Sequence, residues 1–271
     1  MIPFTISDII PSTQLNPTQL NSTGKVDNMI EKSTAVALIG DRYHNSVYIR
    51  TALGKTLVRD LELTIDFTDE VQRLNSETLN NYRMLIVFRD SMIWPNGYGT
   101  SSIISDPPLP KYENRSIHWM TKEQGQAVKD FVKTGGMALF YHNTTYIAAG
   151  NEIFQDVLGA TTEGHPPTRP FKVRITNPDH PITQGVKDFI VTDEQHFMTL
   201  DTDPKFVFME SINEDGLMYQ DMGASCHAGW AYDYGQGRVC YLAPGHTIAA
   251  LWNPEYEKIQ QNAVRWLMKQ I

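Results

Sequence analysis

The chain has 271 residues, enough to bury a full core as one large domain or two small ones, and 41% of them are hydrophobic. Its 23 Lys and Arg residues are outnumbered by 31 Asp and Glu residues, and the formal net charge of -8 argues against nucleic acid or an anionic membrane surface as a partner. This charge balance favours a small polar or neutral ligand.

The first part of the chain, residues 1–33, is rich in Ser, Thr, Asn and Pro and has little hydrophobic periodicity. We predict that it forms an extended N-terminal arm that lies across the domain or a second subunit, and we expect a homo-oligomer. The arm lacks the basic start and apolar core of a signal peptide, and the chain has no apolar run of about 18 residues. A cytoplasmic location is therefore expected.

Strands and helices alternate from residue 34 onward. The apolar runs "TAVALIG", "LELTIDF", "MLIVFRD" and "MALFYHN" are typical of buried parallel strands, and segments with helical spacing lie between them. The helix in "TKEQGQAVKDFVKTGG" has a capping box from Thr121 to Gln124 and stops at Gly135. Residues 91–120 are predicted to form a long loop, which we interpret as a candidate cover over a functional site.

The pattern changes after Gly159, where short strands with tight turns replace the alternation of strands and helices. One turn, "YGQG", is a hairpin signal, and an antiparallel extension of the same sheet accounts for these strands. A last helix begins with Asn253 as its N-cap and Pro254 at its first position, and it should cover the sheet. We therefore predict one α/β domain over residues 34–271 with a mostly parallel central sheet.

Three histidines share one position relative to the predicted strands. His44, His142 and His246 each follow an apolar run, and the ends of parallel strands meet at one edge of a sheet, where ligands bind. A fourth polar cluster, "TDEQHFM", places Glu194 and His196 on one strand face because side chains alternate with a period of two. Imidazoles and carboxylates are ligands of Zn²⁺, and without a metal the same groups can act as acid and base. For each single histidine, the plainer alternative is a hydrogen-bonded loop residue.

Other signatures of chemistry are weak or missing. The segment "GDRYHN" lacks the second and third glycines of the dinucleotide fingerprint and no P-loop sequence occurs, so no nucleotide cofactor is expected. Cys226 precedes His227, but no third group is evident, and a cysteine hydrolase would need Cys226 exposed beside a base. His118, His165 and His180 lack the strand-end position of the other histidines and are left outside the predicted site.

Two long segments, "DHPITQGVKDFIVTDEQHFM" and "AYDYGQGRVCYLAPGHTIAALWNPEYEKIQQNAVRWL", resemble the ThuA-like family, named for trehalose utilisation. The resemblance extends from Ala35 to the C-terminus, and it implies a flavodoxin-like, class I glutamine amidotransferase-like three-layer fold and a role in sugar catabolism. Amidotransferases of that fold carry a catalytic cysteine after a central strand. This chain has His142 and Asn143 there, so glutamine hydrolysis by that route is not expected.

The residue pattern and the resemblance together predict a carbohydrate-metabolism protein that acts on a sugar or keto-sugar by isomerisation or elimination. The alternative is a non-catalytic sugar-binding or assembly subunit that has kept the fold and lost the chemistry. A divalent metal, preferably zinc, is expected on His44, His142, His196 and His246. The predicted catalytic residues are Glu194, Asp193 and His142. The predicted substrate contacts are Trp94, Tyr98, Asn143 and Trp230.

Overall fold

The computed structural model describes residues 33–93 and 116–271. The arm predicted over residues 1–33, apart from its last residue, and the greater part of the loop predicted over 91–120 lie outside the described residues. Within the described residues, no helix is long and apolar enough to cross a membrane.

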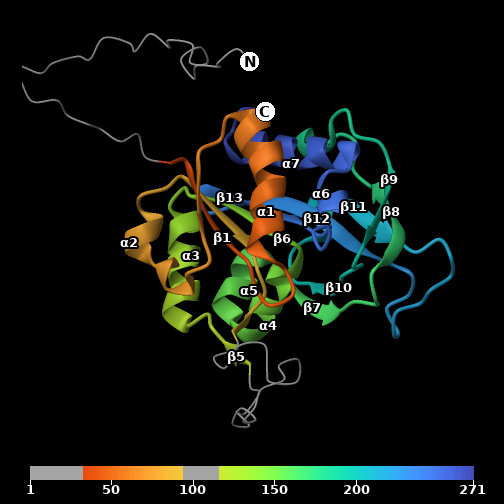
Figure 1. Cartoon of the computed structure of the whole chain (residues 1–271), viewed down its shortest axis with the longest axis horizontal. Helices are drawn as coiled ribbons and strands as arrows, with labels where there is room; N and C mark the ends of the chain where they lie inside the picture. The colour runs from red at the N-terminus through yellow and green to blue at the C-terminus, as the bar shows by residue number, and fades with distance from the viewer. Residues whose placement is uncertain (1–32, 94–115) are drawn as a thin grey trace, which may run out of the picture. The chain divides into compact units, whose positions relative to one another are not determined.

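A nine-stranded sheet organises the described residues (Figure 1). Its parallel half contains, in spatial order, β2 (Ile65–Thr68), β1 (Ala35–Ile39), β3 (Met84–Phe88), β6 (Met137–Tyr141) and β13 (Gly237–Leu242). The sheet continues through antiparallel pairs with β12 (Ser225–Tyr234), β11 (Val207–Ile212), β8 (Arg169–Ile175) and β9 (Phe189–Asp193). The predicted mostly parallel sheet with an antiparallel extension is confirmed.

Helices cover both faces of the parallel half. The strands β1, β3 and β6 are therefore fully buried, and each is a continuous apolar run. One layer contains α1 (Ser46–Leu53), the π-helical segment η1 (Gly54–Arg59), α6 (Ile248–Leu251) and α7 (Pro254–Leu267). The other layer contains α2 (Ser76–Leu79), α3 (Lys122–Lys133), α4 (Thr145–Gly150) and α5 (Glu152–Leu158).

Smaller elements connect these layers. Two short antiparallel sheets are formed by β4 (Met92–Ile93) with β5 (Ile117–His118) and by β7 (Ala160–Gly164) with β10 (Phe197–Leu200). Single 3₁₀ turns occur at Val71–Arg73, His142–Thr144, Pro181–Thr183 and Pro204–Phe206. The second of these turns follows β6 directly and becomes important for the site.

Side-chain caps fix helix ends at the positions that the sequence predicted. The Thr121 hydroxyl accepts the amide of Gln124 at 3.2 Å, and the Gln124 side chain accepts the amide of Thr121 at 2.9 Å, so the predicted capping box is present. Asn253 caps α7 by accepting a backbone N–H of the first turn, with Pro254 as the first helical residue. The Asn253 side chain also donates to the backbone oxygen of Ile190 at 3.1 Å, which ties the start of α7 to β9.

Aromatic side chains and both cysteines belong to the core. Trp230 and Tyr241 stack in the interior with ring centroids 4.2 Å apart. Cys226 and Cys240 are buried free thiols, and burial raises the pKa of Cys226 to about 11. Because a buried, protonated thiol is a poor nucleophile, the cysteine hydrolase alternative lacks the exposed Cys226 that it requires.

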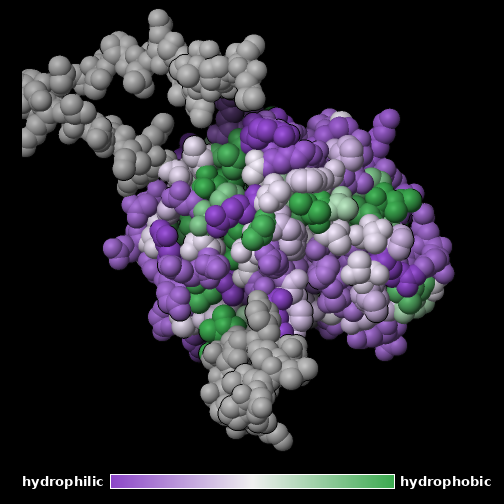
Figure 2. Space-filling view, viewed as in Figure 1, coloured by the Kyte–Doolittle hydropathy of each residue, from purple (hydrophilic) through white to green (hydrophobic). Residues whose placement is uncertain are grey.

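Polar residues cover most of the face shown in Figure 2, where hydrophobic residues appear as separate patches. The most exposed large hydrophobic side chains among the described residues are Val47 on α1, at 70%, and Met218 in the loop after β11, at 64%. Several histidines and carboxylates are buried at one edge of the sheet, and this is unusual because charged side chains are mostly exposed in folded proteins.

Candidate functional site

Four loops meet at the carboxyl ends of the parallel strands. His44 comes after β1, Asp90 after β3, His142 after β6 and His246 after β13. Since parallel strands place their carboxyl ends along one edge, residues that are distant in sequence become neighbours there. The ring centroid of His44 lies 4.9 Å from that of His142 and 4.9 Å from that of His246. The structure thus brings together the three histidines that the strand pattern placed at this edge.

Glu194 lies at the centre of this group and follows the last residue of β9. Its Oε2 atom is 3.1 Å from Nδ1 of His246 and 3.4 Å from Nε2 of His142. Nε2 of His44 is 3.1 Å from Nδ1 of His246. The ligand atoms of these four residues all lie within 4.8 Å of one another. We call His44, His142, Glu194 and His246 the inner set.

Hydrogen bonds hold the rings of His44 and His142 from the side away from Glu194. Nδ1 of His142 lies 2.8 Å from the backbone oxygen of Ala243, which can only accept, so Nδ1 carries the proton. Nδ1 of His44 lies 2.9 Å from the Asp41 carboxylate and donates to it. Both rings therefore present the lone pair of Nε2 to the centre, as metal-ligating histidines do.

The turn that carries His142 is strained. Its φ of 48° lies in the left-handed region that residues with a side chain seldom adopt. Gly245, from the loop after β13, packs against it so closely that a Cβ atom there would come within 2.7 Å of Cβ of His142. The position of the His142 ring is thus set by two neighbouring strand ends.

Asp193 makes three hydrogen bonds to backbone amides at this edge of the sheet. It is completely buried, and its carboxylate accepts the amide of Gly245 at 3.0 Å and the amide of His246 at 2.9 Å. It also accepts the amide of Glu194 at 2.7 Å. These three bonds fix the loops that carry His246 and Glu194. Asp193 therefore positions these loops, and its role as a catalytic base stays a prediction.

Burial and the central carboxylate set the charges of the cluster. Burial raises the pKa of Glu194, but the polar contacts with His142, His196 and His246 outweigh it and hold that pKa well below its usual range. The contact with Glu194 raises the pKa of His246. Burial lowers the pKa of both His142 and His196. An ionised carboxylate therefore faces the buried imidazoles of His142 and His196, which remain neutral at pH 7, and it favours the protonated form of His246.

A cavity of about 370 Å³ lies beside this cluster, within the range of about 300–1,000 Å³ that is usual for small-molecule sites. Asn143, a predicted substrate contact, forms part of its wall, and its side-chain amide also donates to Asp41 at 2.7 Å. The lining residues are Tyr43, His44, Asp90, Met92, Asn143, Tyr146, His165, Glu194 and His196.

His165 and His196 form a second set with Glu194, whose Oε2 atom is 3.6 Å from Nε2 of His165 and 3.5 Å from Nε2 of His196. We call His165, Glu194 and His196 the outer set. The sequence grouped His196 with the ligands of the inner set, and the structure corrects that grouping. The site predicted from the sequence left out His165. The segment "ATTEG", which forms β7 and directly precedes His165, lacks apolar alternation and was not recognised as a strand.

Asp90 and Tyr146 are further cavity residues that the predicted site did not include. Burial and the charge of Asp41 raise the pKa of Asp90 to about 6, and its Oδ1 atom accepts the amide of Met92 at 2.8 Å. The ring of Tyr146, on α4, lies 5.9 Å from the ring of His196. The position of Asp90 just after an apolar strand was the signal that could have identified it.

The three aromatic residues predicted to contact substrate have different outcomes. Trp94 and Tyr98 lie outside the described residues. Trp230 has no exposed surface, and its indole N–H donates to the backbone oxygen of Leu158 at 2.8 Å. The prediction for Trp230 is wrong, because a ring buried against Tyr241 cannot meet a ligand in the cavity.

The sequence matches the family model ThuA, described as trehalose utilisation, over residues 35–267. The chain belongs to the ThuA family. The matched range includes every residue of the inner and outer sets, and the resemblance seen in the two long segments is confirmed. No curated protein matches the chain with significance.

Solved structures of ThuA-like proteins share this fold. One from Bacteroides uniformis is 17% identical, with a TM-score of 0.61 over 90% of this chain and 95% of that chain. One from Parabacteroides merdae is 13% identical, with a TM-score of 0.65 over 89% of this chain and 91% of that chain. A β-galactosidase from Rahnella sp. R3 is 13% identical, with a TM-score of 0.52 over 88% of this chain and 31% of that chain. At these identities the likeness concerns the fold alone.

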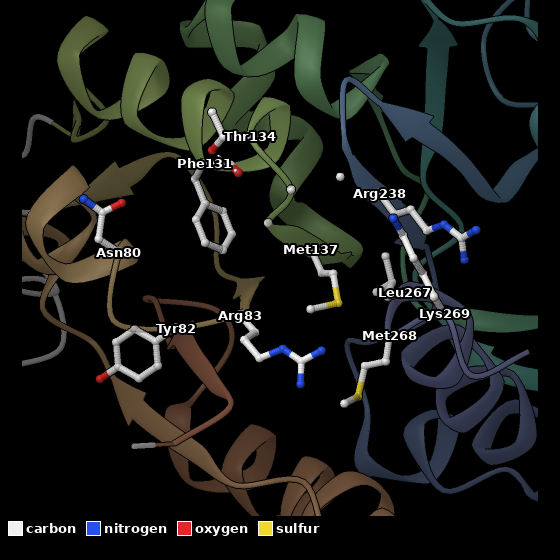
Figure 3. A pocket seen from close by; sticks show the side chains of 13 residues that line it. Asn80, Tyr82, Arg83, Phe131, Thr134, Met137, Arg238, Leu267, Met268 and Lys269 are labelled. Carbon is white, nitrogen blue, oxygen red and sulfur yellow. Dashed lines mark hydrogen bonds between the residues drawn. The ribbon is translucent and has the colours of Figure 1, made fainter. Parts of the chain in front are cut away.

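A second cavity, of about 400 Å³, lies at the opposite edge of the parallel half, at the amino ends of β3, β6 and β13. Figure 3 shows the side chains of Arg83, Met137, Arg238 and Lys269 around it. Its lining contains no histidine and no carboxylate. Of these two cavities in the described part of this ThuA-family chain, only the one at the carboxyl edge is lined by histidines and carboxylates.

Proposed function

We propose that this ThuA-family protein is an enzyme that acts on a keto-sugar. It would move a proton on the carbon beside the carbonyl, and so isomerise the sugar or eliminate a group from it. The observation that carries the proposal is the inner set, in which three imidazoles and one carboxylate gather their ligand atoms in one place. The cavity volume and the acidic net charge suit a small, hydroxyl-rich substrate without negative charge.

The separations within the inner set fit a bound divalent metal ion. Ligand atoms held about 2.0–2.1 Å from zinc in a tetrahedron lie about 3.3 Å apart. The distances from Glu194 Oε2 to the nitrogens of His246 and His142 are 3.1 and 3.4 Å, and that between His44 and His246 is 3.1 Å. Imidazole nitrogens suit zinc, copper, iron and nickel, and zinc is the ion that we expect.

An unpartnered nitrogen also supports a metal ion. Nε2 of His142 is buried and forms no hydrogen bond with the described residues. Its 3.4 Å separation from Glu194 Oε2 exceeds the length of a charge-assisted hydrogen bond, about 2.7–2.9 Å. A buried polar atom without a partner costs free energy, and a metal ion between His142 and Glu194 would remove that cost. When bound, the ion would polarise the carbonyl oxygen of the substrate.

Asp90 is the group to which we assign the proton transfer. Glu194, the base preferred from the sequence, is engaged by the surrounding imidazoles and serves as a metal ligand in this proposal. Asp90 lines the same cavity and belongs to neither set. Its pKa of about 6 is close to neutral pH, where a general base accepts and returns a proton most effectively.

Polar and aromatic groups of the cavity wall would hold the sugar in place. The amide of Asn143 and the hydroxyl of Tyr146 can form hydrogen bonds with sugar hydroxyls. Tyr43 is 54% exposed, and its ring can stack on a sugar face at the entrance. These residues would bind and orient the substrate so that its acidic carbon faces Asp90.

Deuterium exchange tests the proposal directly. The purified full-length chain would be analysed for bound metal and incubated with a panel of keto-sugars in ²H₂O. We expect a divalent metal and, for at least one keto-sugar, incorporation of deuterium beside the carbonyl, seen by NMR. The Asp90→Asn variant should retain the metal and lose the exchange. Sugar binding without exchange or conversion would instead favour the non-catalytic sugar-binding alternative.

A further inference from the structure

We propose that the same cavity binds a second divalent cation, held by the outer set His165, Glu194 and His196, with Glu194 bridging it to the ion of the inner set. This inference rests on the metal site of the proposed function and extends it from one ion to a pair. The ligand atoms of the outer set lie within 4.8 Å of one another, as do those of the inner set.

His196 is the residue that most clearly needs a ligand. It is 2% exposed, and neither of its ring nitrogens has a hydrogen-bond partner among the described residues. Its Nε2 atom lies 3.5 Å from Oε2 of Glu194, too far for a strong hydrogen bond and suitable for two ligands of one cation. A buried imidazole without a partner is rare in a folded protein, so we expect this ring to bind a ligand.

His165 completes the outer set from another part of the chain. It follows β7, whereas His196 precedes β10, and these two strands pair with each other. The two rings are stacked, with centroids 4.8 Å apart and planes at 22°. The side chain of His165 is 27% exposed, so this ligand position is open to the cavity and to an entering ion.

A single ion cannot use both sets. Two ligands on opposite sides of one ion can be at most about 4.2 Å apart when each bond is near 2.1 Å. The histidine nitrogens of the inner and outer sets do not gather into one group even within 4.8 Å, and the two groups share only Glu194. The geometry therefore points to two ions on either side of this carboxylate.

The shared oxygen also sets the distance between the two ions. All four histidine contacts of Glu194 are made to its Oε2 atom. Two ions that each bind this oxygen at about 2.1 Å would be up to about 4 Å apart, in the range of two-metal enzymes. Such a pair can clamp two neighbouring oxygens of one substrate. The substrate class is thereby narrowed to sugars in which the ketone stands beside a hydroxyl group.

Zinc stoichiometry tests the inference. The full chain would be stripped with a chelator, reloaded with Zn²⁺, dialysed and analysed by mass spectrometry of the metal. We expect two ions per chain for the wild type and one for His165→Ala, a twofold drop. His165 is chosen because it is partly exposed, so its loss should not prevent folding. His165→Asp, which restores an oxygen ligand, should recover two ions, which a merely structural role of the ring would not explain.

The control is His227→Ala, a partly buried histidine on β12 outside both sets, which should keep two ions. Reloading with Mn²⁺ gives a second readout, because two Mn²⁺ ions at this distance couple magnetically, whereas the His165→Ala protein should show the spectrum of an isolated ion. One zinc per chain in both wild type and His165→Ala would overturn the second site and leave the proposed function intact. Complete absence of zinc binding in the wild type would overturn the metal site itself.

Discussion

The two edges of the parallel half of the sheet are formed by the same strands, but polar side chains are buried at the carboxyl edge and exposed at the amino edge. At the carboxyl edge, His142 and Asp193 have no exposed surface and His44 has 4%. At the amino edge, Arg83 and Lys269 are exposed to solvent. Solvated charges at a sheet edge need no special explanation, whereas buried polar groups cost free energy unless each is partnered or used. Burial of polar side chains, more than their presence, therefore marks the edge that carries the candidate site.

Removing a ligand at the carboxyl edge should give the largest effect on function. His246→Ala deletes the nitrogen that lies 3.1 Å from both Glu194 Oε2 and His44 Nε2. We expect bound metal to be lost and kcat/KM for a keto-sugar to fall by at least about 100-fold. The melting temperature of the metal-free protein should change little, since the side chain is partly exposed. Retention of full activity and metal by this variant would contradict the proposed site.

Removing a large side chain near the amino edge should do the reverse. Trp266 on α7 is 8% exposed and packs under the guanidinium of Arg238, whose Cζ atom is 4.4 Å from the ring centroid. Trp266→Ala should lower the free energy of unfolding by about 3–5 kcal/mol through the cavity that it leaves. Urea titration measures this loss. Activity and metal content per folded molecule should stay at the wild-type level, and a loss of metal in the folded fraction would show that the two edges are coupled.

The layout of the fold could be predicted from the sequence because it depends on strong local signals. Buried parallel strands such as Ala35–Ile39 and Met137–Tyr141 are unbroken apolar runs, and the helix caps at Thr121 and Asn253 have clear side-chain signatures. The convergence of the strand-end histidines followed from the rule that parallel strands end at one edge. These features need no knowledge of distant contacts.

The remainder of the site depends on contacts between distant segments. Nothing local to Asp193 shows that its carboxylate accepts amides from residues 245 and 246. An aromatic such as Trp230 looks alike in sequence whether it lines a cavity or fills the core. His165 was missed because the strand before it, Ala160–Gly164, is held by pairing with β10 and has no apolar periodicity of its own. Each miss is a case in which tertiary pairing decided the role of a residue.

Disturbing Asp193 should affect both stability and the site, with a smaller effect than either variant above. In Asp193→Asn, one oxygen is replaced by an NH₂ group, which must face an amide donor of either Gly245 or His246. We expect a loss of about 1–3 kcal/mol in the free energy of unfolding from the unsatisfied donors. The apparent Kd for zinc should rise because the loop carrying His246 is less well fixed. An unchanged Kd together with reduced stability would limit Asp193 to a purely structural role.

Asp90→Asn should change how stability depends on pH. The pKa of Asp90 is raised from 3.8 to about 6 by burial and by Asp41, so the folded state disfavours the ionised form. The penalty is absent below about pH 4, develops as pH rises from about 4 to 6, and is complete above pH 6. The metal-free variant should therefore be more stable than the wild type above pH 6, on the order of 2 kcal/mol, and equal to it near pH 4. If the difference in the free energy of unfolding between the variant and the wild type were the same near pH 4 and above pH 6, the raised pKa would be contradicted.

The smallest effect is expected at the amino edge, where Arg83 is exposed and precedes β3. Arg83→Ala removes a solvated charge and should change the free energy of unfolding by no more than about 0.5 kcal/mol, because exposed charges contribute little. Keto-sugar turnover and zinc stoichiometry should both match the wild type. The matched comparison is His246→Ala, which likewise removes a polar side chain next to a central strand, but at the other edge. A loss of turnover in Arg83→Ala comparable to that in His246→Ala would mean that the cavity at the amino edge takes part in the reaction, and the contrast between the two edges would then fail.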